Sequence, residues 1–289
     1  MKIRFWGVRG SVAVAGPKTQ HFGGNTSCVE VFEKNHRVIL DAGTGLRALG
    51  IPLSKKDKVE SDIHLFITHC HLDHIVGLPF FKPLHHPKQD ICLYGPVNKN
   101  RKLQDIVASV FSQETFPVSF DEIPAKLTFK ELVRDKVSVG SLHVSSFPIN
   151  HPGSTLGYVI SNGKKKIAYL PDHEPIDGHS HFEEKSQAFD DKYNADLKTF
   201  LKGCDALIHD AFFTDAHYEK FHGWGHSPLG YPIKLVKDCG IKRLIYFHYA
   251  PEATDQELKR HRDWAAKKIK KLKMNVDLIM AREGLVINL

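Results

Sequence analysis

Short runs of β-branched and aromatic residues, separated by Gly, Pro, Asn and charged residues, recur along most of the chain. Such runs are typical of β-strands, because branched and aromatic side chains fit a pleated, half-buried surface. The pattern predicts ten strands. They are residues 2–8, 28–32, 37–43, 63–68, 91–95, 142–149, 156–161, 166–172, 206–213 and 243–248.

Segments with helical length or helical spacing of apolar residues lie between and after these runs. They are residues 75–84, 99–112, 196–202, 228–238 and 254–272. The mixture predicts an α/β or α+β fold with two sheets and helices outside them. No internal repeat, low-complexity tract or Gly/Ser-rich linker marks a boundary, so we expect a single domain over residues 1–289.

Two polar, Pro-containing stretches, 112–126 and 173–195, interrupt the regular pattern and are either active-site lids or plain surface loops. In the first, Phe116 and Phe120 could stack on a nucleobase, although core packing is the commoner fate of Phe. The second contains two histidines that either line an entrance, with or without an adventitious metal, or stand in an exposed loop: His179 and His181.

The segment THCHLDHIVGLPFF (68–81) places four ligand-type residues within six positions, where the predicted strand 63–68 ends. They are His69, His71, Asp73 and His74. Imidazoles and carboxylates this dense repel or desolvate one another unless a divalent cation compensates them. The segment therefore predicts a metal site, with Cys70 and Leu72 as spacers that point away.

Four residues are too few to complete the coordination of two metals, so further ligands are expected at the ends of other strands. Three residues fit, because each lies just beyond an apolar run: His151, Asp172 and His248.

This arrangement resembles the metallo-β-lactamase fold superfamily, and within it the ribonuclease Z-like and cyclic-phosphate phosphodiesterase branch. The resemblance implies a four-layer αββα sandwich and a site for two divalent metals, zinc by preference or manganese because of the hard carboxylate oxygens. It implies that His69, His71 and His151 hold one metal and that Asp73, His74 and His248 hold the other. Asp172 is then the residue that bridges the two metals. The resemblance also gives Asp41 the role of supporting the ligand loop.

The run Pro171–Glu174 departs from the family pattern, because it lacks the usual Gly before the bridging Asp. His173 therefore stays open as a competing ligand.

Two later segments, ALIHDAFF (206–213) and GWGHSPLG (223–230), resemble paired motifs of ribonuclease Z-like enzymes, in which an acid orients a histidine near the phosphate. Here these residues are Asp210 and His226. A carboxylate bonded to one imidazole nitrogen favours the cation and lets the other nitrogen donate to substrate or leaving group. With Asp73, they form the expected catalytic set, the alternative for His226 being a helix N-cap.

The Gly-rich N-terminal segment carries polar residues between two predicted strands, and such a loop can approach a phosphate. Arg9, Asn25 and Ser27, together with His226, are the expected substrate contacts. A hairpin with positive φ at Gly23 and Gly24 would produce the same sequence pattern.

Composition indicates the charge of the expected ligands and the expected cellular compartment. A formal charge of +7 favours anionic ligands, while the basic runs 163–166 and 267–273 are typical of solvated surface. Five scattered cysteines without a C-x-x-C pair fit a reducing cytoplasm. The first residues lack an apolar signal region and no stretch approaches a membrane span, so we expect a cytoplasmic protein without membrane contact.

The resemblance implies hydrolysis of a small cyclic nucleotide or cyclic phosphate by a hydroxide that bridges the metals, with His226 protonating the leaving oxygen. The partner is then a small anionic phosphodiester, with a homodimer as the candidate assembly. Only 21 positions separate His151 from Asp172, which leaves no room for a tRNA-clamping arm. An RNA-processing nuclease is therefore the second hypothesis, a thioester or lactone hydrolase the third, and a metal-binding sensor without turnover the fourth.

Overall fold

The computed structural model describes residues 1–54, 62–114, 116–177 and 180–289. The strands of these residues form two seven-stranded sheets. In the first sheet, the order β14-β1-β2-β3-β4-β5-β6 joins strands Val286–Asn288, Lys2–Gly7, Cys28–Glu33, His36–Leu40, Ile63–Phe66, Asp90–Pro96 and Lys126–Leu132. In the second, the order β13-β12-β11-β10-β9-β8-β7 joins Asp277–Met280, Arg243–Phe247, Ala206–Asp210, Lys166–Leu170, Leu156–Ser161, Leu142–Pro148 and Lys136–Val139.

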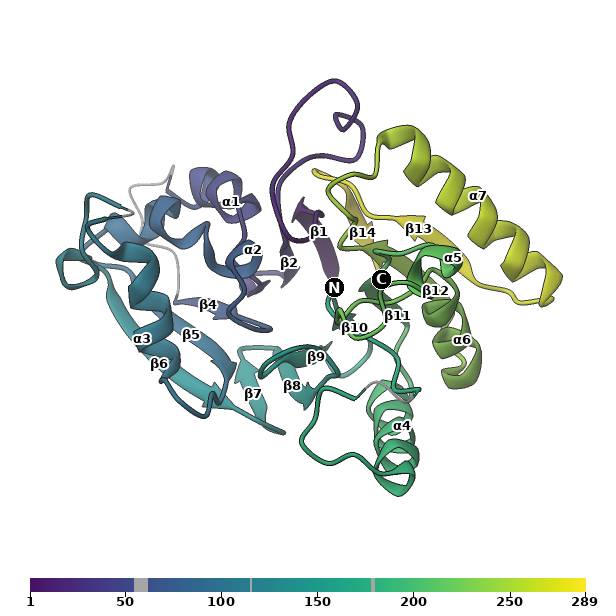
Figure 1. Cartoon of the computed structure of the whole chain (residues 1–289). Coiled ribbons are helices and arrows are strands. Elements are labelled where there is room, and N and C mark those ends of the chain that lie inside the picture. Colours follow the sequence, from purple (N-terminus) through teal and green to yellow (C-terminus); the bar gives the residue numbers. More distant parts are fainter. Residues whose placement is uncertain (55–61, 115, 178–179) are drawn as a thin grey trace.

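Helices cover the outer face of each sheet (Figure 1). Over the first sheet lie α1 (Gly45–Leu53), α2 (Leu72–Ile75), α3 (Leu103–Ala108) and the short 3₁₀ turns η1 (Leu78–Phe80), η2 (Lys82–His85), η3 (Ser109–Phe111) and η4 (Phe120–Glu122). Over the second lie α4 (Gln187–Leu201), α5 (Asp215–Tyr218), α6 (Gly230–Cys239) and α7 (Asp255–Lys271). The predicted four-layer αββα sandwich is confirmed.

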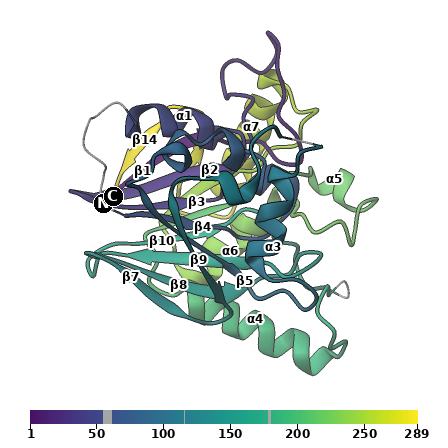
Figure 2. The same ribbon diagram turned by 90° about the vertical axis from the view of Figure 1, so that its left-hand side faces the viewer.

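The apolar core forms two clusters. The larger cluster fills the space between the sheets, where Phe5, Tyr158, Ile208 and Phe247 are fully buried, and it extends to the helices over the second sheet through residues such as Leu197 and Ile233. The smaller part lies between the first sheet and its helices. The two termini lie side by side, because Leu289 N donates to Met1 O, and Figure 2 shows them together at one end of the stacked sheets.

Strand direction decides where functional side chains gather. Strands β10, β11, β12 and β13 pair in parallel, so their carboxyl ends lie along one edge of the second sheet. Asp172, Asp210 and His248 stand at or just after three of these ends. Parallel α/β sheets commonly place their sites at this edge.

Several elements differ from the sequence prediction, each for a local reason. The helix predicted at 75–84 is broken into α2, η1 and η2, because Pro79 and Pro83 can begin a turn but cannot continue a helix. Helix α4 begins inside the predicted irregular stretch 173–195, where Ser186 Oγ accepts a hydrogen bond from Phe189 N and caps it. Helix α1 and strands β6, β7, β13 and β14 were not predicted.

The described residues of the stretch 112–126 pack on the smaller part of the core through their apolar side chains. The ring centroids of Phe116 and Phe120 lie 6.0 and 5.9 Å from that of Phe111. Phe116 also meets Phe80 edge to face at 5.4 Å. Both phenylalanines therefore pack against the core.

None of the helices in the described ranges has the length and apolar content that a membrane crossing demands. All five cysteines are free thiols within the described part of the chain.

Candidate metal centre

The ligand loop leaves β4 and turns into the short helix α2. His69, Asp73 and His74 are buried at the inner side of this loop, whereas Leu72 is 65% exposed and points away as predicted for a spacer. The Cys70 side chain packs against the smaller core, and burial raises the pKa of its thiol to about 11. The alternation of inward and outward residues gives the loop one face made of ligand atoms.

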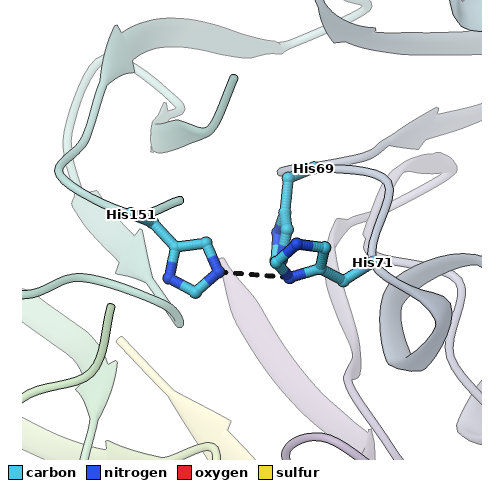
Figure 3. Close-up of side chains that lie close together, drawn as sticks. All are labelled: His69, His71 and His151. Carbon is cyan, nitrogen blue, oxygen red and sulfur yellow. Dashed lines mark hydrogen bonds between the residues drawn. The ribbon is translucent and has the colours of Figure 1, made fainter. Parts of the chain in front are cut away.

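The first group of ligands combines two segments far apart in sequence. His69 and His71 come from the loop, and His151 follows β8 and faces them (Figure 3). Nε2 of His151 lies 3.2 Å from Nδ1 of His71, and one ligand atom from each of the three residues falls within 4.8 Å of the others. His151 Nδ1 donates to Gly225 O at 2.8 Å, which leaves Nε2 for a metal.

Burial lowers the pKa of His151 to about 3. The ring is therefore neutral near pH 7, which is the form that binds a metal.

The second group lies beside the first. Asp73 Oδ2 is 3.2 Å from Nε2 of both His74 and His248. Asp172 Oδ2 is 3.1 Å from Nε2 of His74 and 3.2 Å from Nε2 of His248, while its Oδ1 is 3.9 Å from Nε2 of His151. Asp172 thus faces both groups, one carboxylate oxygen toward each.

These residues fit a pair of divalent cations. Among the described residues, His69 Nε2, His74 Nε2 and Asp172 Oδ2 are buried without a hydrogen bond of good geometry, although His74 Nε2 and Asp172 Oδ2 lie 3.1 Å apart. A buried polar atom without a partner is costly, and three of them at one point call for a bound group that satisfies them together. Imidazole nitrogen and carboxylate oxygen are the ligands that zinc and manganese take in proteins.

Asp41 supports the loop from behind. Its carboxylate accepts hydrogen bonds from Thr68 N at 2.7 Å, from Thr68 Oγ1 at 2.9 Å and from Tyr169 Oη at 2.8 Å, and it lies 2.9 Å from His74 Nδ1. The residue adopts φ +60°, a left-handed conformation that Asp tolerates better than most residues. It follows that Asp41 fixes the ring of His74 without facing the cluster itself.

Asp210 and His226 form a close pair at the edge of the cluster. His226 Nδ1 lies 2.8 Å from Asp210 Oδ2 and 3.7 Å from Asp172 Oδ1. Burial raises the pKa of Asp210. For His226, burial acts to lower the pKa, but the Asp210 carboxylate outweighs it and the pKa is raised. The ring of Phe212 stacks on His226 at 4.2 Å and fixes its plane.

The N-cap alternative for His226 does not hold. Helix α6 begins at Gly230 with Leu229 at the N-cap position, and no side chain caps it.

Glu174 supports the site by holding a neighbouring loop, and the sequence pattern alone does not single it out. Its buried carboxylate accepts hydrogen bonds from Gly223 N at 2.7 Å, Gly225 N at 2.8 Å and Tyr218 Oη at 3.1 Å, and it pairs with His181 Nε2 at 2.8 Å. It therefore holds the loop that carries both His226 and the carbonyl bonded to His151. The available signal in the sequence is an acid two positions after Asp172.

The remaining histidines of this region have other partners. His181 pairs with Glu174 instead of forming a separate metal site, and His179 lies outside the described residues. His173 is fully buried, with Nδ1 accepting from Asn150 N at 3.3 Å and Nε2 3.3 Å from Tyr231 Oη. Both of its nitrogens are used, so His173 does not compete as a metal ligand.

The expected substrate contacts of the N-terminal segment need correction. Arg9 is fully buried and donates to three main-chain carbonyls, those of Gly23, Ala250 and Ala253. Ser27 is also fully buried. These side chains offer no surface to a substrate and hold the loop together.

Asn25 likewise serves the loop, since its Nδ2 donates to Glu283 Oε2 at 3.0 Å. The segment reaches the ligand cluster through a different residue: Ser11 N donates to Asp73 Oδ2 at 2.7 Å.

Comparison with known proteins agrees with this geometry. A family model described as the beta-lactamase superfamily domain matches residues 36–249. Ribonuclease BN of Cronobacter sakazakii is 24% identical over 279 residues, covering 82% of this chain and 87% of that protein.

Among solved structures, the short form of human tRNase Z superposes with a TM-score of 0.67 at 20% identity, covering 100% of this chain and 99% of that one. A diphosphatase from the PhnP family superposes with a TM-score of 0.66 at 18% identity, covering 100% and 97%. The chain therefore belongs to the beta-lactamase superfamily, in the metallo-β-lactamase fold branch that includes the ribonuclease Z and ribonuclease BN proteins.

Proposed function

We propose that this protein is a binuclear metal-dependent phosphodiesterase that hydrolyses a small cyclic nucleotide or cyclic phosphate. The observation that carries the proposal is the Asp210–His226 pair, whose ring lies 3.7 Å from the carboxylate that faces both ligand groups. A hydrolase of thioesters or lactones needs the ligand cluster but has no evident use for a cationic histidine beside it. A non-catalytic sensor has no chemical need for the pair either.

In this proposal, His69, His71 and His151 would hold one metal, Asp73, His74 and His248 would hold the other, and Asp172 would contribute one carboxylate oxygen to each. Two divalent ions bound there would lower the pKa of a water molecule and neutralise charge on the phosphate oxygens. Zinc suits the histidine-rich first group, and manganese is the alternative because Asp73 and Asp172 add hard oxygen ligands.

The protein's own residues then handle the proton. Asp210 accepts from Nδ1 of His226, which keeps that nitrogen protonated and leaves Nε2 as the donor. The Asp210 carboxylate outweighs burial and raises the pKa of His226, which favours the cationic ring, so His226 can stabilise negative charge on the phosphoryl group and protonate the leaving oxygen. Phe212 holds the ring plane during this transfer.

The short interval between His151 and Asp172 favours a small substrate. It consists of a short loop and strands β9 and β10, which pair in antiparallel register. No additional element leaves this hairpin to contact a large RNA. An RNA-processing nuclease remains the second candidate function, because the relative from Cronobacter sakazakii carries the name ribonuclease BN and aligns over most of this chain.

The test is metal content together with hydrolysis of bis(p-nitrophenyl) phosphate, 3′,5′- and 2′,3′-cyclic nucleotides, a precursor tRNA and a thioester. Two metals per chain with cyclic-nucleotide turnover is the expected result. Turnover restricted to the precursor tRNA would replace the leading proposal with the second. Turnover restricted to the thioester would show that the role given to Asp210 and His226 is wrong.

A further inference from the structure

A cleft of about 780 Å³ opens beside the ligand cluster. Its walls come from three places: the N-terminal segment at Ser11 and Val12, the segment from Phe212 to His226, and the residues that lead into α7. Figure 1 shows the N-terminal segment rising beside the start of α7, and Asp255 N donates to Lys18 O where they meet. The cleft is therefore built from parts of the chain that the fold holds in fixed positions.

We propose that this cleft binds the nucleobase of the substrate, an inference that rests on the proposed phosphodiesterase function. The cleft is continuous with the reacting centre through two of its lining residues. Ser11 donates its N–H to Asp73, and His226 pairs with Asp210. A phosphate held at the ligand cluster would thus carry its attached nucleoside directly into the cleft.

The aromatic wall of the cleft supports a flat, stacking ligand. Trp224 is 62% exposed although it stands two residues from His226. Phe221 meets its indole edge to face at 5.2 Å, and Phe221 itself stacks on Phe213 at 5.1 Å with planes 2° apart. This ladder holds the indole in place while leaving much of it open, and an open aromatic face at a site is the usual platform for a base.

Polar groups of both kinds stand around the aromatic wall. Lys220 supplies a donor, Glu252 supplies an acceptor, and His217 and His261 can each supply either. An apolar cleft with a few polar groups is typical of small-ligand sites. The edges of nucleobases present donors and acceptors side by side, so this mixture matches a base better than it matches an aliphatic alcohol.

A second cleft, of about 740 Å³, is lined by Lys99 and Arg101 and by residues 153–156, which follow His151 in the chain. Within the described ranges, its lining contains none of the seven metal-ligand residues and neither member of the Asp210–His226 pair. Lys99 is also paired with Glu183. The cleft at Trp224 is therefore the one placed to receive the substituent of the phosphate.

The experiment measures binding of adenosine 5′-monophosphate and of methyl phosphate to the metal-loaded protein by isothermal titration calorimetry. Loss of one stacking contact predicts that Trp224→Ala lowers the ratio of the two affinities about tenfold. Trp224→Phe keeps an aromatic face and should restore most of that ratio. Trp264→Ala is the matched control, because Trp264 is a half-exposed indole on α7 that stacks with Lys268 outside the cleft. An unchanged ratio in Trp224→Ala would overturn the inference.

Measurements of turnover test this inference separately from the proposed function. The expected result is that Trp224→Ala lowers kcat/KM for 3′,5′-cyclic AMP relative to methyl p-nitrophenyl phosphate. Hydrolysis of both by the wild-type protein, with the same preference in Trp224→Ala, would reject the nucleobase cleft and leave the phosphodiesterase standing. Selective binding of the nucleotide without hydrolysis of any diester would reject the phosphodiesterase instead. A Trp224 effect confined to a short oligoribonucleotide would support the cleft and assign the base to an RNA chain.

Discussion

Nδ1 of His74 lies 2.9 Å from Oδ2 of Asp41, and neither side chain has any exposed surface. Burial acts to lower the pKa of His74, but Asp73, Asp41 and Asp172 outweigh it and the pKa is raised. The contact with Asp41 fixes the tautomer, so Nε2 points at Asp73 and Asp172 with its lone pair available once a metal replaces the proton.

We predict that Asp41→Asn lowers metal affinity about tenfold to a hundredfold, the range typical for loss of a partner behind a histidine ligand. Competition with a chelator measures this, and circular dichroism checks that the variant is folded. Asp90→Asn, an exposed acid on β5, is the control. Unchanged affinity in a folded Asp41→Asn protein would remove Asp41 from the site.

Asp172→Ala should remove metal and activity together. The carboxylate faces both ligand groups, so its loss takes a candidate ligand from each and removes one of the carboxylates beside His74 and His248. Elemental analysis after extensive dialysis gives the metal content, with the exposed Asp121→Ala as control. A variant that kept two tightly bound metals would contradict the bridging assignment.

His226→Ala should behave differently, because the proposed role of this ring is proton transfer and not metal binding. We expect both metals to stay bound and kcat to fall by about a hundredfold to ten-thousandfold. Asp210→Asn should lower kcat through the same ring, so the double variant should be little worse than His226→Ala alone. Full activity of His226→Ala would reject the general-acid role.

Glu174→Gln should lower stability in a way that depends on pH. Burial acts to raise the pKa of Glu174, but hydrogen bonds from His181, Gly223, Gly225 and Tyr218 outweigh it and the pKa is lowered. A lowered pKa in the folded protein contributes stability above the unfolded pKa of about 4.3, and this contribution is lost as the pH falls through the folded value.

The free energy of unfolding of Glu174→Gln should therefore be about 2 kcal/mol below that of the wild type at pH 7, and the gap should shrink in acid. Urea unfolding at pH 7, 5 and 4 measures it. A gap that is equal at all three values would show that the charge of Glu174 is not what holds the loop.

Arg9→Lys tests whether this residue is structural. A lysine ammonium cannot span the three carbonyls that the guanidinium fork reaches, so we expect a loss of about 2–4 kcal/mol of stability. KM should stay near the wild-type value at a temperature where the variant is folded. A raised KM without a change in stability would restore the original expectation of a substrate contact.

The sequence by itself determined the set of candidate metal ligands, and the structure brings all seven together. A strand can be predicted from a local pattern of residues, and parallel strands bring their carboxyl ends to one edge of a sheet. For this reason the sequence alone singles out the H-x-H-x-D-H segment and the three single residues that follow later strands. The pairing of Asp210 with His226 is implied only by the family resemblance. Neither spacing nor composition links two residues that lie 16 positions apart, across a turn and a short helix.

Only the tertiary structure decided the surroundings of these ligands. The sequence predicts that Arg9 contacts the phosphate of a substrate. In the structure its guanidinium donates instead to the carbonyls of Ala250 and Ala253, more than 240 positions away. The buried role of Glu174, the amide of Ser11 and the cleft at Trp224 likewise depend on segments that are distant in sequence. Hydrogen bonds and cavities of this kind arise when two sheets pack face to face. The pattern of residues along the chain does not specify which loops will then lie in contact.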